Sequence, residues 1–182
     1  MNKLSKELPK HLSYHSVEHI KDVYNAAEQL GKAENLNAYE IKLLLTAALY
    51  HDAGFLKGAA NHEEESCNLA REALPGFGYK PDEIDRICGM IMATKIPQSP
   101  NNHLEEILAD ADLDYLGRDD FFTIGNKLFT ELSMFGFLDT EEEWNRLQVR
   151  FLNSHHYFTT TALQLRQDKK QEHLEQIKAK LT

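Results

Sequence analysis

The adjacent residues His51 and Asp52 stand at the end of an apolar stripe, where polar side chains are least expected. His51 follows Ala48 by three residues and Asp52 follows it by four, so helical spacing turns both side chains toward the buried face. The stripe itself consists of Ile41, Leu44, Leu45 and Ala48. Burying an ionised carboxylate without a compensating charge is very costly. Because no lysine or arginine lies near the pair on this helix, a bound metal ion is the indicated partner.

His19, Asp112 and His62 repeat this anomaly, each in line with the apolar residues of a different predicted helix. His15 lies one helical turn before His19. One buried histidine alone is usually a satisfied core residue, but imidazole and carboxylate groups that several helices aim inward indicate a shared cation. Mixed nitrogen and oxygen ligands fit Mn, Fe, Co, Ni, Zn or Mg, and the sequence does not choose among these divalent ions.

The elements that carry these residues are all predicted to be helices. Apolar residues recur at helical spacing nearly throughout the chain, and no alternation typical of a strand is present. A capping residue followed three positions later by glutamate predicts helix starts at Asn37, Asn61 and Thr140. The charged tail from Gln164 onward predicts a last amphipathic helix, in which His173 faces solvent. We therefore expect an all-α chain.

The composition is that of an ordinary globular domain. The chain has 182 residues, of which 42% are apolar and 27% charged, and this suits one domain with a full core. Its net charge of −9 would repel duplex nucleic acid, and no apolar run is long enough to span a membrane. The first residues lack the apolar stretch of a secretory signal, so a cytoplasmic location is expected. Cys67 and Cys88 are expected to be buried free thiols.

The order His19, His51-Asp52, Asp112 resembles the H…HD…D motif of the HD superfamily of metal-dependent phosphohydrolases. The separations, 32 residues and then 60, are of the kind found in that fold. The resemblance covers roughly residues 14–135 and implies that these four residues bind the metal. It implies a single compact HD/PDEase-like domain of about seven to nine helices over residues 1–182. Residues 14–135 would form the metal-binding core, and the helices of residues 140–182 would pack on it.

Asp112 is one of three acidic residues spaced by two, Asp110, Asp112 and Asp114, which cannot all face one way on a helix. In the HD family the second aspartate of a DAD segment binds the metal, and residues 110–113 are similar to that segment. The resemblance therefore assigns the metal to Asp112. It leaves Asp110 and Asp114 to face solvent or to support the ligands.

Residues 14–19, Tyr-His-Ser-Val-Glu-His, are similar to the YHNxxH segment of class I cyclic nucleotide phosphodiesterases, with Ser16 in place of the asparagine. In that family the second histidine binds metal and the first protonates the leaving oxygen. The resemblance implies that His19 is a ligand and that His15 is the general acid. Asp52, besides binding metal, would orient or deprotonate the attacking water. Because this match is partial, it does not by itself imply cyclic nucleotide substrates.

HD proteins that hold two metals use further histidines after the HD pair. His62 lies where the first of these is expected, but residues 90–95 contain no histidine. One metal per chain is therefore expected in preference to two, and His62 would face the substrate or reach the metal through water. Thr94 and Lys95 are candidates to contact a substrate phosphate, although an exposed lysine at a helix end is as good an interpretation of Lys95.

These residues together predict a metal-dependent phosphohydrolase that cleaves a phosphomonoester or a phosphodiester, with a nucleotide as one candidate substrate. The expected partner is a small anionic phosphate ester. Two alternatives stay open. The missing histidines argue against a di-iron oxygenase of the HD type, and the intact ligand set argues against a non-catalytic regulatory module. The sequence leaves open whether the chain forms a homodimer and what His155 and His156 do.

Overall fold

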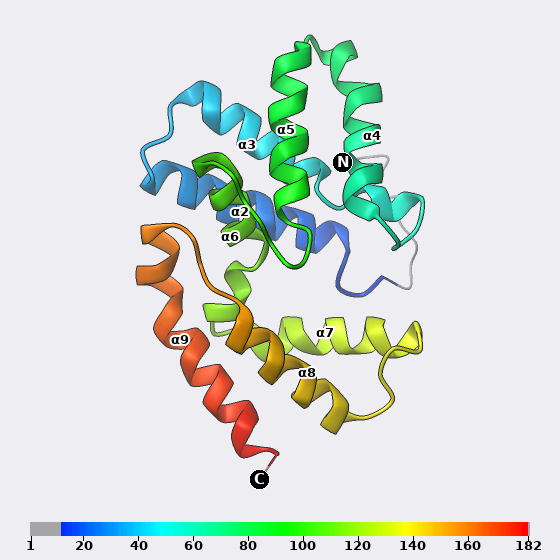
Figure 1. Ribbon diagram of the computed structural model, residues 1–182, viewed down its shortest axis with the longest axis vertical. Coiled ribbons are helices and arrows are strands. Elements are labelled where there is room, and N and C mark those ends of the chain that lie inside the picture. The colour runs from blue at the N-terminus through cyan, green and yellow to red at the C-terminus, as the bar shows by residue number, and fades with distance from the viewer. Residues whose placement is uncertain (1–11, 182) are drawn as a thin grey trace.

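The computed structural model describes residues 12–181, and every regular element among them is helical (Figure 1). Three short 3₁₀ helices, η1 (Ala53–Leu56), η2 (Leu74–Phe77) and η3 (Asp114–Gly117), separate some of the α-helices. The α-helices are α2 (Val17–Ala33), α3 (Ala38–Tyr50), α4 (His62–Ala73), α5 (Pro81–Ala93), α6 (His103–Asp112), α7 (Phe121–Met134), α8 (Glu141–Ser154) and α9 (Thr160–Ala179). The prediction of an all-α chain is confirmed.

Two of the three predicted capping boxes form. The Asn37 side chain accepts hydrogen bonds from the first turn of α3 while Glu40 reaches back to the Asn37 N–H, and Thr140 with Glu143 does the same for α8. The prediction at Asn61 is wrong, since its side chain caps nothing. Asn61 instead adopts a left-handed conformation with φ of 54°, which lets the loop after η1 turn sharply into α4.

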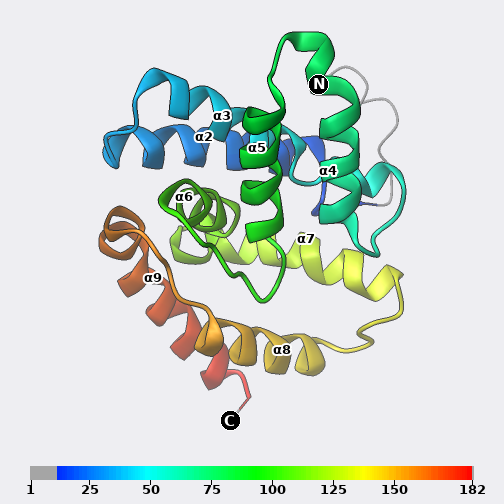
Figure 2. The same ribbon diagram turned by 45° about the horizontal axis from the view of Figure 1, so that its top comes forward.

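The helices α2 to α6 surround one apolar core, and η3, α7, α8 and α9 share a second (Figure 1). The first core has Leu44, Ile91 and Ile107 at its centre. Cys67 and Cys88 are free and lie in it, as predicted. The second core includes Phe121 and Leu152. Figure 2 shows α7 running between the α2–α6 group and α8, so the two cores meet along α6, η3 and α7.

The last helix packs on the body of the chain through η3 and α8. Its Leu174 and Ile177 are buried in the second core. The expectation that His173 faces solvent is wrong, because the ring stacks on Phe121 at 4.5 Å and its Nδ1 donates to the Leu116 carbonyl. Both partners lie some fifty residues away in sequence, where helical spacing gives no information. No helix among residues 12–181 is long and apolar enough to cross a membrane.

Candidate metal centre

The imidazole of His51 is held in one tautomer by the helix that precedes it. His51 caps the C-terminus of α3, and its Nδ1 lies 2.8 Å from the Ala48 carbonyl oxygen, which can only accept a hydrogen bond. The proton therefore sits on Nδ1, and the lone pair of Nε2 points away from α3. This is the arrangement by which a backbone carbonyl usually orients a metal-binding histidine.

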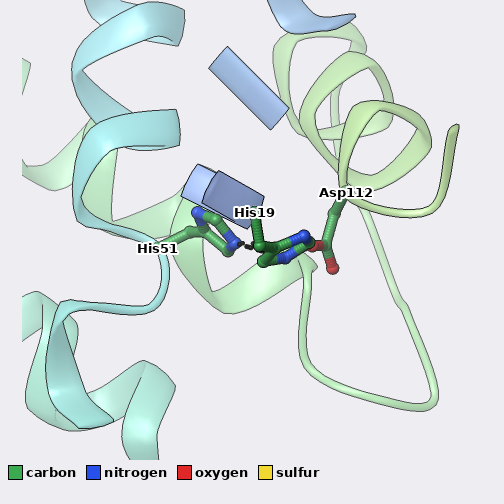
Figure 3. A group of neighbouring side chains, drawn as sticks. All are labelled: His19, His51 and Asp112. Atoms are coloured by element: carbon green, nitrogen blue, oxygen red, sulfur yellow. Dashed lines mark hydrogen bonds and ion pairs between the residues drawn. The ribbon is translucent and has the colours of Figure 1, made fainter. Parts of the chain in front are cut away.

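His19 and Asp112 bring two further donors to the same point from α2 and from the last residue of α6 (Figure 3). The Nε2 atom of His19 lies 3.3 Å from His51 Nε2 and 3.1 Å from Asp112 Oδ1. The ligating atoms of these three residues all lie within 4.8 Å of one another, as the donors around one ion must. Two imidazole lone pairs converge on one point here, and this is favourable only if a proton or a metal ion lies between them.

The Asp52 carboxylate completes the cluster and supplies a test of whether a metal fits. Its Oδ2 atom lies 3.2 Å from His51 Nε2 and 3.5 Å from His19 Nε2. Oδ2 is buried and has no hydrogen-bond partner among the described residues. A buried carboxylate oxygen without a partner is costly, and a cation among these donors would remove that cost. The residues therefore fit a divalent ion with two imidazole and two carboxylate ligands.

The charges of the cluster reinforce one another. Burial raises the pKa of Asp52, but the charge and hydrogen bond of His51, together with the charges of His15 and His19, outweigh it, so that its pKa lies well below the usual range. Burial also opposes ionisation of Asp112, yet hydrogen bonds from His19 and His51 hold its pKa at about 2. Conversely, burial lowers the pKa of His51, and the two carboxylates raise it more. The site therefore keeps its carboxylates ionised and attracts positive charge, which a metal ion supplies as well as a proton does.

The segment after the HD pair is fixed tightly against α4. Ser66 on α4 donates a hydrogen bond to the His51 carbonyl at 2.7 Å and accepts one from the Gly54 N–H at 2.8 Å. Gly54 lies so close to α4 that a Cβ atom there would stand 1.9 Å from the His62 carbonyl oxygen. Only glycine allows this approach. The packing sets the direction of the Asp52 side chain and brings His62 beside it.

The sequence interpretation missed Glu131, which holds the candidate acid His15. Glu131 is buried on α7 and accepts a short hydrogen bond from His15 Nδ1 and another from the Tyr14 N–H at 2.8 Å. The ring of His15 also stacks on Phe55 with centroids 4.1 Å apart. A signal for Glu131 existed, since it follows Leu128 by three residues on the apolar face of its helix, as His51 follows Ala48.

The residues predicted to contact substrate divide into two groups. His62 lies beside the cluster, with Nε2 at 3.6 Å from Asp52 Oδ1 and 3.4 Å from Glu63 Oε1, and Thr94 lines the same pocket. The structure does not bring Lys95 to the site. Its ammonium group pairs with Glu64 at 2.6 Å in a half-exposed position outside the pocket. Spacing along the helix could not distinguish a phosphate contact from an exposed lysine, because the deciding feature is the ion pair of Lys95 with Glu64 on α4.

Asp110 and Asp114, the neighbours of Asp112, do not face solvent. Asp110 is fully buried and accepts hydrogen bonds from the N–H groups of Phe158 and Thr159, which tie the segment before α9 to α6. Asp114 forms an ion pair with Arg166 at 2.7 Å. Both therefore stabilise the packing of the C-terminal helices.

His155 and His156 lie outside the site. His156 is exposed, and His155 accepts a hydrogen bond from the buried ammonium group of Lys170. Neither residue lines the pocket at the cluster.

The family model HD-CE matches residues 9–124, which is more than half of the 182 residues. The chain belongs to the HD-CE family. Membership of the HD superfamily, inferred from the order of the four candidate ligands, is thereby confirmed. The family model spans all four of these residues, together with His15 and His62. No curated protein sequence matches this HD-CE chain.

Two solved structures share the fold of this HD-CE chain. A predicted HD superfamily hydrolase from an uncultured Thermotogales bacterium has a TM-score of 0.65 at 16% identity, over 100% of this chain and 91% of its own. A protein from Lactobacillus plantarum has a TM-score of 0.68 at 19% identity, over 98% of this chain and 93% of its own. At such identities the similarity shows a common fold and no common substrate.

Proposed function

We propose that this chain is a metal-dependent phosphohydrolase that cleaves a small anionic phosphomonoester or phosphodiester. The observation that carries the proposal is the convergence of His19 Nε2, His51 Nε2 and Asp112 Oδ1 within 4.8 Å, beside an unpartnered Asp52 oxygen. A divalent ion held there would supply Lewis acidity, which lowers the pKa of a bound water and neutralises charge on the phosphate. These four residues would hold that ion.

Asp52 is suited to two roles because its two oxygens face different ways. Oδ2 lies against His19 and His51, whereas Oδ1 lies toward His62, and the residue lines the open pocket. Oδ1 can therefore accept a hydrogen bond from the attacking water and orient it, or take its proton. His62 lies on the same side and can position the water or a phosphate oxygen.

His15 is suited to protonate the leaving oxygen. Burial lowers its pKa, but the hydrogen bond with Glu131 and the charge of Asp52 raise it more, so that its pKa lies above its ordinary value. With Nδ1 engaged by Glu131, the proton on Nε2 is the one that His15 can give away. Glu131 acts through His15 and does not line the pocket itself. We therefore treat it as a positioning residue.

The proposal is tested by assaying the purified full chain on a generic phosphate ester with added Mn²⁺, Ni²⁺ or Co²⁺. We expect hydrolysis that requires the metal, and a loss of about a thousandfold or more in kcat for Asp52→Ala, the scale seen when one member of a catalytic set is removed. Asp119→Ala is the matched control, because this carboxylate is 95% exposed and forms a surface ion pair with Lys169. Activity that survives Asp52→Ala would refute the assigned site.

A further inference from the structure

A pocket of about 380 Å³ runs from the ligand cluster into the space between η3, α7 and α8. His15, His19, Asp52 and Asp112 line one end of it. Its volume falls in the range of pockets that bind small molecules. At about 30 Å³ per molecule it would hold roughly a dozen waters, far more than hydrolysis needs. The space beyond the cluster is therefore large enough for an organic group attached to a phosphate.

The wall of the pocket away from the cluster is apolar. It is formed chiefly by Leu116, Leu128, Leu132, Trp144, Leu147 and Phe151. The amide of Gln148 and the indole N–H of Trp144 are the polar groups that α7 and α8 contribute, and the amide nitrogen lies 3.4 Å from Asn145 Oδ1. Ile96, which is 53% exposed, extends the apolar surface to the edge of the pocket. A ligand group in this space would exchange water for aliphatic and aromatic carbon.

We propose that this pocket binds the organic group of the substrate, and that this group is an apolar alkyl or aryl chain joined to a single phosphate. The proposal rests on the proposed function for the phosphate end and specifies the substrate class of the same site. An apolar chain that leaves water for such a wall gains affinity with its length, by roughly threefold to fourfold for each methylene buried.

A nucleotide fits this wall less well. A purine or pyrimidine carries several hydrogen-bonding groups along its edge, and the ribose carries hydroxyls. The α7–α8 wall offers them one amide and one indole N–H, so most groups of a base lying against it would lose water without gaining a partner, which weakens binding. No lysine or arginine among the described residues lines the pocket, so a second or third phosphate would also lack a counter-charge.

Trp144 provides a measurement that does not depend on turnover. It is the only tryptophan of the chain and lies in the pocket wall, so its fluorescence reports occupancy. We would titrate the full chain with ethyl phosphate, hexyl phosphate and adenosine monophosphate, first without metal and then with Mg²⁺, which offsets the charge of Asp52 and Asp112 beside the phosphate. We expect a Kd for hexyl phosphate at least tenfold below those of the other two. Equal affinity for the ethyl and hexyl esters, or tighter binding of the nucleotide, would overturn the proposal.

Gly125 on α7 allows the pocket to be filled directly. A Cβ atom there would lie 3.6 Å from Gln148 and 3.7 Å from Trp144, which are ordinary contact distances, so a side chain is accommodated and points into the pocket. In Gly125→Leu we expect the hexyl-to-ethyl ratio to fall below about threefold, because the leucine takes the place of the chain. Asn126→Leu, which adds the same side chain at an exposed neighbouring position, should retain the wild-type ratio.

The ratio in the wild-type chain decides the proposal even if Gly125→Leu fails to fold. A strong preference for hexyl phosphate with no hydrolysis of any ester under any metal would support this pocket and overturn the proposed function. Metal-dependent hydrolysis, with an affinity that does not depend on the length of the alkyl chain, would support the proposed function and overturn the proposal for this pocket. A ratio in Gly125→Leu equal to that of wild type would place the binding elsewhere and overturn the assignment to this pocket.

Discussion

The group α2 to α6 and the pair α7 and α8 border the same pocket but contribute opposite surfaces to it. The first group presents imidazoles and carboxylates, each fixed by a neighbour, as the Ala48 carbonyl fixes His51 and Ser66 fixes the turn after it. The second presents leucine and aromatic side chains with a single amide among them. We propose that α2 to α6 hold the metal and the reacting groups, whereas α7 and α8 bind the organic group of the substrate. Substitutions in the first region should therefore lower metal affinity and kcat, and substitutions in the second should change which substrate is preferred.

Removing a ligand should have the largest effect, because it acts on the fixed region. In His51→Gln we expect the affinity for Mn²⁺ to fall about a thousandfold, more than the tenfold to hundredfold typical of losing a residue that only orients a ligand. Titration calorimetry measures this, and His156→Gln, at an exposed site, is the control. A variant that binds Mn²⁺ as tightly as the wild type would place the metal elsewhere.

Glu131→Gln tests whether α7 also serves the reaction, through His15. Losing the carboxylate removes a cause that raises the pKa of His15, so that pKa should fall toward the value that burial favours. The protonated acid would then be lost at lower pH, and the alkaline limb of the kcat profile should move to lower pH. We expect kcat near neutral pH to fall by about a hundredfold, the scale of general acid catalysis.

Mn²⁺ affinity supplies the control for this variant, since Glu131 does not contact the ligand cluster. A profile whose alkaline limb stays in place would show that Glu131 has only a structural role. His15→Asn should remove that limb altogether.

Substitution of one glycine in each region should have the smallest effects, and these effects compare how tightly the two regions are packed. Gly54→Ala forces a Cβ atom against the His62 backbone and should destabilise the fold by about 2 kcal/mol. Gly125→Ala adds a methyl group at ordinary contact distance from Gln148 and Trp144, and it should stabilise α7 by about 0.5–1 kcal/mol through helix propensity. Urea unfolding of both variants measures the difference. If both variants lowered the free energy of unfolding equally, the α7–α8 wall would be as tightly packed at Gly125 as the segment after His51 and Asp52 is at Gly54.

The sequence predicted the positions that depend on local spacing. The spacing indicates His19, His51 and Asp112 because each lies in line with an apolar stripe, and helical periodicity is enough to say which way a side chain points. The all-α fold and the capping boxes of α3 and α8 follow from the same local rules. Glu131 obeyed these rules too and could have been found with them.

The remaining features depend on partners far away in sequence. Lys95 meets Glu64, Asp110 meets the backbone before α9, and His173 meets Phe121, and none of these contacts has a local pattern. The apolar pocket is of the same kind, since α7 and α8 leave space between them that periodicity cannot distinguish from a filled core. Contacts between distant helices therefore decide which partners Lys95, Asp110 and His173 meet, and whether α7 and α8 leave a pocket between them.

Anomalous scattering from a crystal soaked in Mn²⁺ would show whether the four proposed ligand residues bind the metal, because it locates the ion without depending on any substrate. We expect one strong peak per chain, bounded by His19 Nε2, His51 Nε2, Asp112 Oδ1 and Asp52 Oδ2. A map with no peak among these four residues, or with its strongest peak held by other side chains, would contradict this expectation.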